Sequence, residues 1–576
     1  MDLRQRVTFP QVFGALLGLL ALIHIPSKVT PGAFDRNAAP QFILLVFIGF
    51  VCAVRIVVTR NLQLSKSVVY VLGSLMLFTL ASLILSDDKV VGLIGDTGRF
   101  NGLISLWSLT LIAITATSLS KFQFFTVLFG ASWGVVSVTA LGLLQSYDRI
   151  FLPSGGGAGS TLGNLDFLSA WIGTTLLLAF LFFREYGFPK YVFPLYLILS
   201  LVVLFKIEAK QGFVDLALVL LCVVCVKALR VFDFSEISTT VWKVVATLGL
   251  LLWSEAIYLI PMANIQIPGI GDDVNVRIRA DFWYSAAQMF FHNFAFGVGP
   301  DNYGNYYEKY RSLSSVENTE FVIANDAHSS MMQSFATLGI FSTLAFLIII
   351  LMVIYSCINL INRKGGGIYG YLLIAFLVFY TNSLISPVTL PNKALFWMVA
   401  GFVIGEDLRS RNKATSEITK QVLLPIVAIT AAISLVITSV FAFSFLTLNS
   451  ALATKREGGR VQYVATQSLP CVVYSNAQVG LVDKSGGDVV AASQRILETH
   501  PRCLDALGLL ANAYLAKEDY VGAKPIIYQL LDVAPARKSV VRLAAIYALG
   551  AKDQEMQQIL AAQGFKLGLL NLDSNG

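Results

Sequence analysis

The feature that most constrains this chain is a ladder of long apolar segments. A helix needs about 20 mainly apolar residues to cross the hydrocarbon core of a bilayer, and about thirteen segments approach that length. Hydrophobic residues make up 56% of the chain and charged residues only 13%, which excludes a soluble globular protein. We predict membrane spans near residues 8–26, 40–58, 67–86, 103–119, 123–145, 165–183, 191–206, 212–229, 241–262, 331–358, 368–386, 393–408 and 421–446.

Lysine and arginine residues recur in every second turn of this ladder. They lie before the first span and after the second, fourth, sixth, eighth, tenth and twelfth spans. Turns with this bias face the cytoplasm in membrane proteins, so we predict a cytoplasmic N-terminus. The net charge of +7 reports this topology rather than nucleic-acid binding. The segments expected outside the cytoplasm are 87–102, 146–164, 207–211, 263–330 and everything after Leu448.

The last part of the chain has a different composition. We divide the chain into a membrane domain, residues 1–448, with its large outside loop at 263–330, and a tail domain, residues 449–576. The tail has the spacings of a tetratricopeptide repeat, and Pro501 lies 34 residues before Pro535, one repeat length. A different small helical bundle also fits. The residues that carry the repeat are Leu507, Leu510, Ala511, Tyr514, Ala523, Ile527, Leu530 and Pro535.

One such repeat cannot bury its own apolar face. We therefore expect residues 489–497 and 540–560 to supply neighbouring helices. We also expect the repeat face of the tail to bind a protein partner or the carrier of the acceptor. Cys471 and Cys503 are candidates for a disulfide in this compartment, although their spacing alone does not establish one.

Cationic side chains also lie in turns that should face outwards, where topology does not require them. A lipid-linked diphosphate, which carries about two negative charges, is a natural partner for such cations. The alternative is that they only reach towards lipid headgroups. The candidate substrate-binding cations are Arg99, Lys210, Arg277, Arg279 and Arg311.

Arg279 and Trp283 are four residues apart on a helix that we expect to begin near Asn275. Residues at that spacing share one helix face, which places the guanidinium at the loop end of an apolar stripe. Trp283 therefore joins the candidate substrate-binding residues. Tyrosines 303, 306, 307 and 310 follow, and they fit either an interfacial belt or a platform for sugar rings.

His328 lies where the outside loop leads into the tenth span. We expect Asp326 to cap that helix and His328 to lie in its first turn. The positive helix end and nearby arginines favour a neutral imidazole, which suits a general base at neutral pH. A histidine that only forms structural hydrogen bonds fits equally well.

The isolated pairs Asp87–Asp88 and Asp272–Asp273 lack further carboxylates, so we expect no metal site and no cofactor.

Two segments of this loop carry a resemblance to a known family. R-A-D-F-W-Y-S-A-A-Q-M-F-F-H-N-F-A-F-G-V-G-P-D-N-Y begins at Arg279, and A-H-S-S-M-M-Q-S-F-A-T-L-G-I-F begins at Ala327. Their order of Arg-x3-Trp, Gly-x-Gly, Ala-His and Leu-Gly resembles the bacterial O-antigen ligase and O-antigen polymerase superfamily. The earlier T-G-R-F-N-G-L and S-T-L-G-N-L-D-F-L resemble segments of the branch that carries tetratricopeptide tails.

The resemblance implies an all-α, GT-C-type membrane fold. It also implies metal-independent transfer of a glycan from an undecaprenyl-diphosphate-linked donor to an acceptor hydroxyl on the outer face of the bacterial cytoplasmic membrane. The acceptor is a lipid, a protein or a glycan, and the family's essential arginine and histidine correspond to Arg279 and His328. Where the family has a Ser-Arg-Gly-like motif, this chain reads Ala209-Lys210-Gln211-Gly212, and lysine lacks the bidentate fork of arginine.

Two functions from other classes stay open. A transporter or flippase for a lipid-linked sugar is expected to show internal repeats and helices broken at the bilayer midplane, and the sequence shows neither. A non-catalytic membrane scaffold that displays the tail would leave His328 and the outside cations without a role.

Overall fold

The structure is a computed structural model, and it describes residues 8–25, 35–150, 152, 158–229, 239–262, 274–312, 315–316, 322, 324–365, 367–412, 417–454 and 489–566. All regular elements within these ranges are helices. Seven of the helices in these ranges are long and apolar enough to cross a membrane: α2 (Ala38–Thr59), α3 (Lys66–Leu85), α6 (Lys121–Ser146), α7 (Leu165–Glu185), α14 (Ser330–Lys364), α15 (Gly367–Ile385) and the Gln421–Leu446 part of α17 (Glu417–Thr454).

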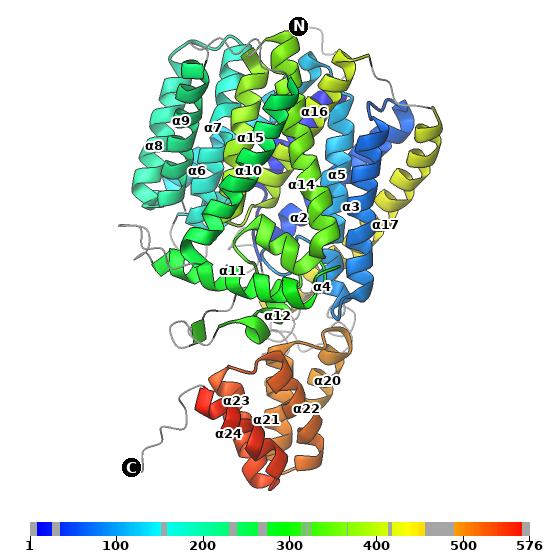
Figure 1. The fold of residues 1–576 in the computed structure, drawn as a ribbon, viewed down its shortest axis with the longest axis vertical. Coiled ribbons are helices and arrows are strands. Elements are labelled where there is room, and N and C mark those ends of the chain that lie inside the picture. The colour runs from blue at the N-terminus through cyan, green and yellow to red at the C-terminus, as the bar shows by residue number, and fades with distance from the viewer. Residues whose placement is uncertain are drawn as a thin grey trace.

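The remaining predicted spans also contain helices, and Figure 1 shows the long helices running side by side. Three are short, with 14, 15 and 16 residues in α1, α5 and α8, and α16 carries several charged residues. A helical membrane protein is therefore confirmed, whereas the count of thirteen spans stays a prediction. These further helices are α1 (Phe9–Leu22), α5 (Leu103–Thr117), α8 (Val192–Ile207), α9 (Lys210–Leu229), α10 (Thr239–Met262) and α16 (Leu390–Ser410).

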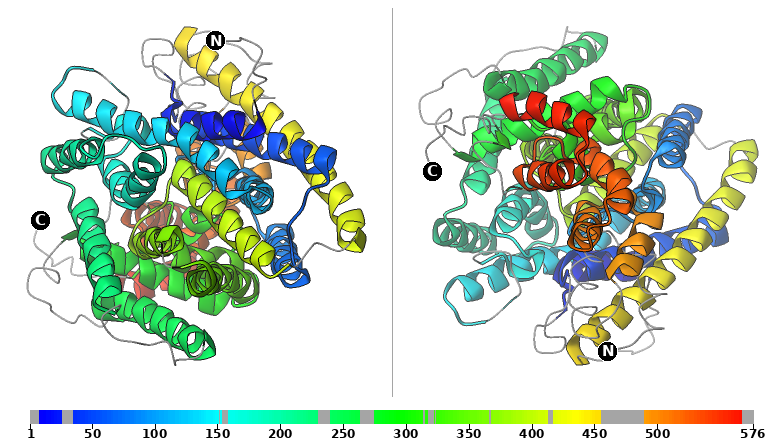
Figure 2. Two further views of the ribbon diagram at one scale, coloured as in Figure 1. Left: turned by 90° about the horizontal axis from the view of Figure 1, so that it is seen from above. Right: turned by 90° about the horizontal axis from the view of Figure 1, so that it is seen from below.

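Facing glycines let helices α1 and α6 approach each other backbone to backbone. A Cβ atom added to Gly14 would lie 2.4 Å from the carbonyl oxygen of Val127, and one added to Gly130 would lie 2.4 Å from the carbonyl carbon of Gly14. Helices in a membrane gain little from the hydrophobic effect, so close van der Waals packing of small residues holds them together. In contrast, α17 runs along the margin of the bundle beside α2 (Figure 2).

Helix α14 is interrupted at Gly339, which has a φ of +70° and a ψ of −172°. The break frees backbone carbonyl groups, and the turn at Gly297 to Gly299 uses them. The N–H of Val298 donates to the Ala336 oxygen at 3.0 Å, and the N–H of Gly299 donates to the Thr337 oxygen at 3.0 Å. The Gly-x-Gly and Leu-Gly motifs are thus two halves of one contact that anchors the large loop on α14.

The two ends of the bundle differ in their charged contacts. At one end Glu406 pairs with Lys364 at 2.7 Å and with Arg409 at 2.8 Å, and Arg409 also donates to the Thr117 oxygen at 2.6 Å. The structure thus joins three of the turns that we predicted to share one side. The opposite end carries α4 (Lys89–Ile94), α11 (Val274–His292) and α12 (Tyr303–Tyr310), with the tail beyond them (Figure 1).

The described part of the tail is a stack of helices, each packed on the next: α20 (Val489–Thr499), α21 (Leu504–Ala516), α22 (Tyr520–Val533), α23 (Lys538–Gly550) and α24 (Gln554–Lys566). The expected apolar face is buried for the most part, with Tyr514 and Pro535 partly exposed. The helices are confirmed, and their assignment as tetratricopeptide repeats stays a prediction. Cys503 is disulfide-bonded, while Cys471 lies outside the described residues, as do all of residues 455–488, which follow the proposed domain boundary after Leu448.

The tail docks on the large loop through charged groups. The Lys309 ammonium lies 2.6 Å from Asp532, and the Arg502 guanidinium lies 4.2 Å from the centre of the Tyr306 ring. Seen from below in Figure 2, the orange and red tail helices cover the green helices of the loop. The tail is therefore seated on the same end of the bundle as the segments that we predicted to lie outside.

Candidate functional site

His328 lies immediately before α14, whose N-cap is Ser329. The Ser329 Oγ accepts the N–H of Met332 at 3.3 Å, while the Asp326 carboxylate accepts the backbone N–H of His328 at 2.6 Å. The predictions that Asp326 caps this helix and that His328 lies in its first turn were therefore wrong. The backbone of His328 has a φ of +52°, a conformation that costs free energy outside glycine.

The ring of His328 has a defined tautomer in its neutral form. Its Nδ1 lies 3.0 Å from the backbone oxygen of Asp326. A carbonyl oxygen can only accept a hydrogen bond, so Nδ1 carries the proton and Nε2 keeps a free lone pair. Burial lowers the pKa of His328, and the nearby positive charges of Arg99 and Arg279 lower it further, although Asp326 opposes them. A neutral imidazole with an available Nε2 can accept a proton near neutral pH.

Two arginines predicted to bind substrate lie within electrostatic range of His328. Arg279 is on α11, and Arg99 is in the loop between α4 and α5. The Arg99 guanidinium lies 5.1 Å from the centre of the Phe167 ring, and its buried Nε has no hydrogen-bond partner among the described residues. The fold thus collects a histidine and two arginines from three segments that are far apart in the sequence.

Trp283 lies one layer behind this group. Its side chain is buried and packs edge-on against Tyr258, with ring centres 5.2 Å apart. The Tyr258 hydroxyl in turn forms a 2.8 Å hydrogen bond with Ser329. Trp283 therefore supports the residues that flank His328. Phe282, not Trp283, lies beside the histidine ring, with ring centres 4.9 Å apart and planes tilted by 40°.

The other predicted cations are placed differently. The Arg311 side chain is buried, pairs with Glu308 at 3.3 Å and donates to the Ser315 oxygen at 3.0 Å, so it holds the loop together. Arg277 and Lys210 are exposed at the starts of α11 and α9. Next to Lys210, Gln211 is buried, and neither its Oε1 nor its Nε2 has a hydrogen-bond partner among the described residues.

The predicted tyrosine cluster resolves into two pairs. Tyr303 and Tyr307 are completely buried in the core of the loop. Tyr306 donates to the carboxylate of Asp87 at 2.5 Å and stacks on Tyr310. The two buried tyrosines therefore form neither an interfacial belt nor an exposed platform for sugars.

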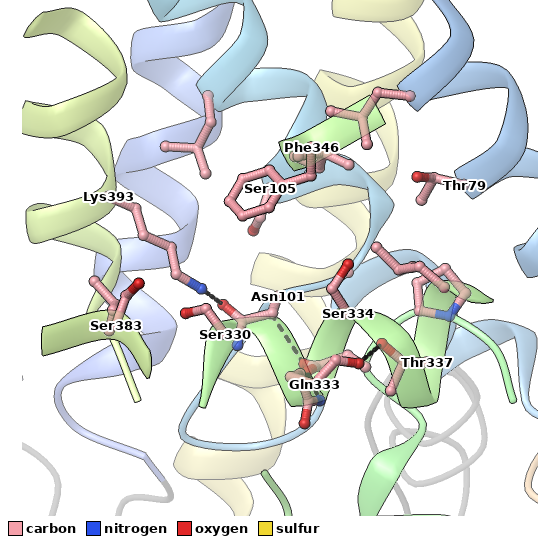
Figure 3. Close-up of a pocket in the computed structure, with 18 of the residues that line it drawn as sticks. Thr79, Asn101, Ser105, Ser330, Gln333, Ser334, Thr337, Phe346, Ser383 and Lys393 are labelled. Carbon is pink, nitrogen blue, oxygen red and sulfur yellow. Dashed lines mark hydrogen bonds between the residues drawn. The ribbon is translucent and has the colours of Figure 1, made fainter. Parts of the chain in front are cut away.

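A cavity lies between α3, α5, α14, α15 and α16, beside the loop that carries His328 (Figure 3). Its volume is about 150 Å³. The charged and amide side chains gather at one end. The rest of the lining is mainly apolar, with the hydroxyl groups of Thr79, Ser105, Ser334, Thr337 and Ser383 among it. The polar end is lined by Asn101, Asp301, Asp326, Ser330, Gln333 and Lys393.

Sequence reasoning missed Lys393 and Asp301. Lys393 is in the first turn of α16, and its ammonium donates to the Asn101 oxygen at 2.6 Å. Asp301 follows the Gly-x-Gly turn and accepts the backbone N–H groups of Asp96 and Asn101, at 2.7 and 2.9 Å. A lysine at the edge of an apolar span was the signal that the sequence offered for the first of these residues.

Burial raises the pKa values of two carboxyl groups in this region. The pKa of Asp301 rises to about 6, and that of Asp96 rises to about 8, with the charge of Asp301 adding to the effect of burial. Asp301 fixes both ends of the turn that contains Arg99, because Asp96 and Asn101 flank it. Within the described ranges, no group of three or more His, Cys, Asp or Glu side chains is arranged to hold a metal ion.

Residues 168–347 match the family model described as O-antigen ligase. This stretch of the chain is therefore similar to the O-antigen ligase family. We call residues 168–347 the ligase domain; they run from α7 to the first part of α14 and include Arg279, His328 and both glycine motifs. A comparison with curated proteins found no match.

The ligase domain supplies only part of the candidate site. Arg99 and Asn101 precede it, and Lys393 follows it, so the family match does not cover these three residues. The tail also lies outside the match. The group around His328 is therefore completed by residues from outside the matched range.

Proposed function

We propose that this protein is a membrane glycan ligase that transfers a glycan from an undecaprenyl-diphosphate-linked donor to a hydroxyl group of an acceptor. The family match supports a membrane ligase or polymerase of glycans. The observation that carries the finer proposal is the contact of the His328 Nδ1 with the Asp326 backbone oxygen. The imidazole is also close enough to Arg99 and Arg279 for their charges to lower its pKa. A proton acceptor next to two cations suits the transfer of a group away from a diphosphate.

In the proposed reaction, Nε2 of His328 takes the proton of the acceptor hydroxyl. The acceptor oxygen attacks the anomeric carbon of the donor sugar as the bond from that carbon to the diphosphate oxygen breaks. The diphosphate leaves on its lipid with the bonding electron pair, and Arg279 and Arg99 stabilise its charge. We propose that these arginines neutralise the diphosphate without a metal ion.

We further propose that the site faces the outside of the bacterial cytoplasmic membrane. Its support is the position of His328 at the opposite end of the bundle from the basic turns of Lys364 and Arg409, because basic turns favour the cytoplasmic side. This topology has thirteen spans, a cytoplasmic N-terminus and an extracytoplasmic tail that meets a protein partner or the carrier of the acceptor.

Deletion of the protein tests the proposed activity. A ligase predicts that one surface glycan is lost from its acceptor while the complete lipid-linked glycan accumulates outside the cytoplasm. A polymerase would instead leave single repeat units on the acceptor, and a transporter would leave the precursor on the cytoplasmic side. Restoration by the wild-type chain but not by His328→Ala would tie the loss to the site. Unchanged glycans and precursors would contradict the proposal.

A further inference from the structure

We propose that the cavity between α3, α5, α14, α15 and α16 binds the isoprenoid end of a lipid phosphate, and that Lys393 binds the phosphate group. This inference rests on the proposed function and adds to it a binding residue outside the ligase domain. It is carried by the division of the cavity into polar and apolar ends and by the surroundings of the lysine ammonium.

The cavity has the lining that an amphiphile requires. Figure 3 shows Asn101, Ser330, Gln333 and Lys393 gathered at its polar end, with Phe346 farther along. The rest of the lining is mainly aliphatic and aromatic. A branched hydrocarbon chain fits such a surface, while a free sugar or a free phosphate would leave it without a partner. The apolar lining includes Leu75, Leu106, Leu109, Phe346, Phe379 and Trp397.

Among the residues that the structure describes, the Lys393 ammonium forms no ion pair, although the charges of Asp326 and Asp301 attract it from a greater distance. Its only hydrogen bond within the described part of the chain goes to the neutral amide of Asn101. Asp301 and Asp326 line the same end, but Asp301 accepts two backbone N–H groups and Asp326 accepts that of His328. Lys393 is partly exposed at the mouth of a mainly apolar cavity. An anion in direct contact would stabilise an ammonium group there, and phosphate is one that lysine binds well.

The polar end of the cavity is connected to His328 through one residue. Asp326 lines the cavity. Its carboxylate accepts the backbone N–H of His328, and its backbone oxygen accepts the Nδ1–H of the same residue. A lipid with its chain in the apolar part and its first phosphate on Lys393 would direct the rest of its head group towards Arg99 and His328. Lys393 therefore anchors the lipid side of the diphosphate, and the arginines meet the side that carries the sugar.

The direct test measures binding without transfer. The purified full-length protein is titrated with three probes: a polyprenyl monophosphate, the corresponding polyprenol and phosphatidylglycerol. Lys393→Met should weaken binding of the polyprenyl phosphate about tenfold or more, because a hydrogen bond to a charged group is lost, and should leave polyprenol binding unchanged. Lys393→Arg should retain most of the affinity. Lys121→Met is the matched control, since Lys121 is an exposed lysine at the other end of the bundle.

A second variant keeps the test decisive if Lys393→Met folds poorly. Leu106→Trp fills the apolar part of the cavity and should weaken polyprenol and polyprenyl phosphate alike. Wild-type affinity in either well-folded variant would overturn the inference, and so would equal binding of phosphatidylglycerol and the polyprenyl phosphate. These outcomes are independent of the proposed function: Lys393-dependent binding in a protein that transfers no glycan would contradict the transfer reaction alone.

Discussion

The Nδ1 atom of His500 in the tail lies 2.6 Å from the Oδ2 atom of Asp88 in the membrane domain, and both side chains are almost fully buried. Asp88 also caps α4 by accepting the N–H of Val91 at 3.0 Å, and its backbone oxygen accepts the Asn302 amide at 3.1 Å. Asp88 thus joins the tail, α4 and the large loop. The loop after α4 carries Arg99, so the tail is connected to the candidate site through a short chain of contacts.

Loss of the His500 contact should loosen this junction. His500→Ala leaves the buried Asp88 carboxylate with fewer hydrogen-bond donors, which costs about 1–3 kcal/mol. We expect faster hydrogen exchange in α4 and α12, and easier proteolytic release of the tail. Arg542→Ala, on an exposed position of the tail, is the control. Wild-type exchange and proteolysis in His500→Ala would show that the tail is held by other contacts.

Gly339 should resist substitution. A Cβ atom there would lie 2.4 Å from the Ala295 oxygen, and the positive φ is unfavourable for other residues. Gly339→Ala should therefore lower the free energy of unfolding by about 1–3 kcal/mol, measured as thermal unfolding in detergent. Gly370→Ala is the matched control, because its added Cβ meets nothing within 4 Å. Equal melting temperatures for the two variants would argue against the tight contact between Gly339 and the backbone of Ala295 and Phe296.

The two arginines of α11 should differ in donor binding. Arg279→Ala is expected to weaken binding of the lipid-linked donor by about 1.5–3 kcal/mol, the range for a hydrogen bond to a charged group. Arg277→Ala should have little effect, since Arg277 is an exposed side chain. Titration of both variants with donor compares two cations of one helix. An equal loss in both would mean that they act through the overall positive charge of the loop.

The rate of transfer should depend on pH through His328. The general base must be neutral, so activity falls as the pH drops through the pKa of His328, which is lowered below its ordinary value of 6.5. Burial and the charges of Arg99 and Arg279 cause this shift. Arg99→Ala should therefore move the acidic limb of kcat/KM to higher pH, and Arg277→Ala should not. If the acidic limb of kcat/KM stays at the same pH in Arg99→Ala, Arg99 does not influence the pKa of His328.

Much of the architecture follows from simple sequence patterns. Apolar length located the helices, and the spacing of Arg279 and Trp283 predicted a shared helix. It was harder to predict which of two neighbouring residues caps a helix. Asp326 and Ser329 are both good helix caps, and only the path of the loop decides that Ser329 takes this role. In the same way, Arg311 has Glu308 three residues before it in the sequence, yet we expected it to bind substrate.

The residues that line the cavity were even harder to predict from the sequence, because tertiary packing brings them together. Lys393 is brought to Asn101 across nearly three hundred residues of chain. Asp301 acts on the turn around Arg99 only because the Gly297–Gly299 turn is seated on the break in α14. Nor did the sequence indicate that, of the neighbours Lys210 and Gln211, the glutamine is buried and the lysine exposed.

The most direct test of the account separates donor binding from glycan transfer in purified His328→Ala protein. The account predicts donor affinity close to that of the wild type, because the arginines and Lys393 remain. It also predicts a transfer rate lower by about 10²- to 10⁴-fold, the usual contribution of a general base. A well-folded His328→Ala protein that transfers glycan at nearly the wild-type rate would contradict the central claim that His328 is the base.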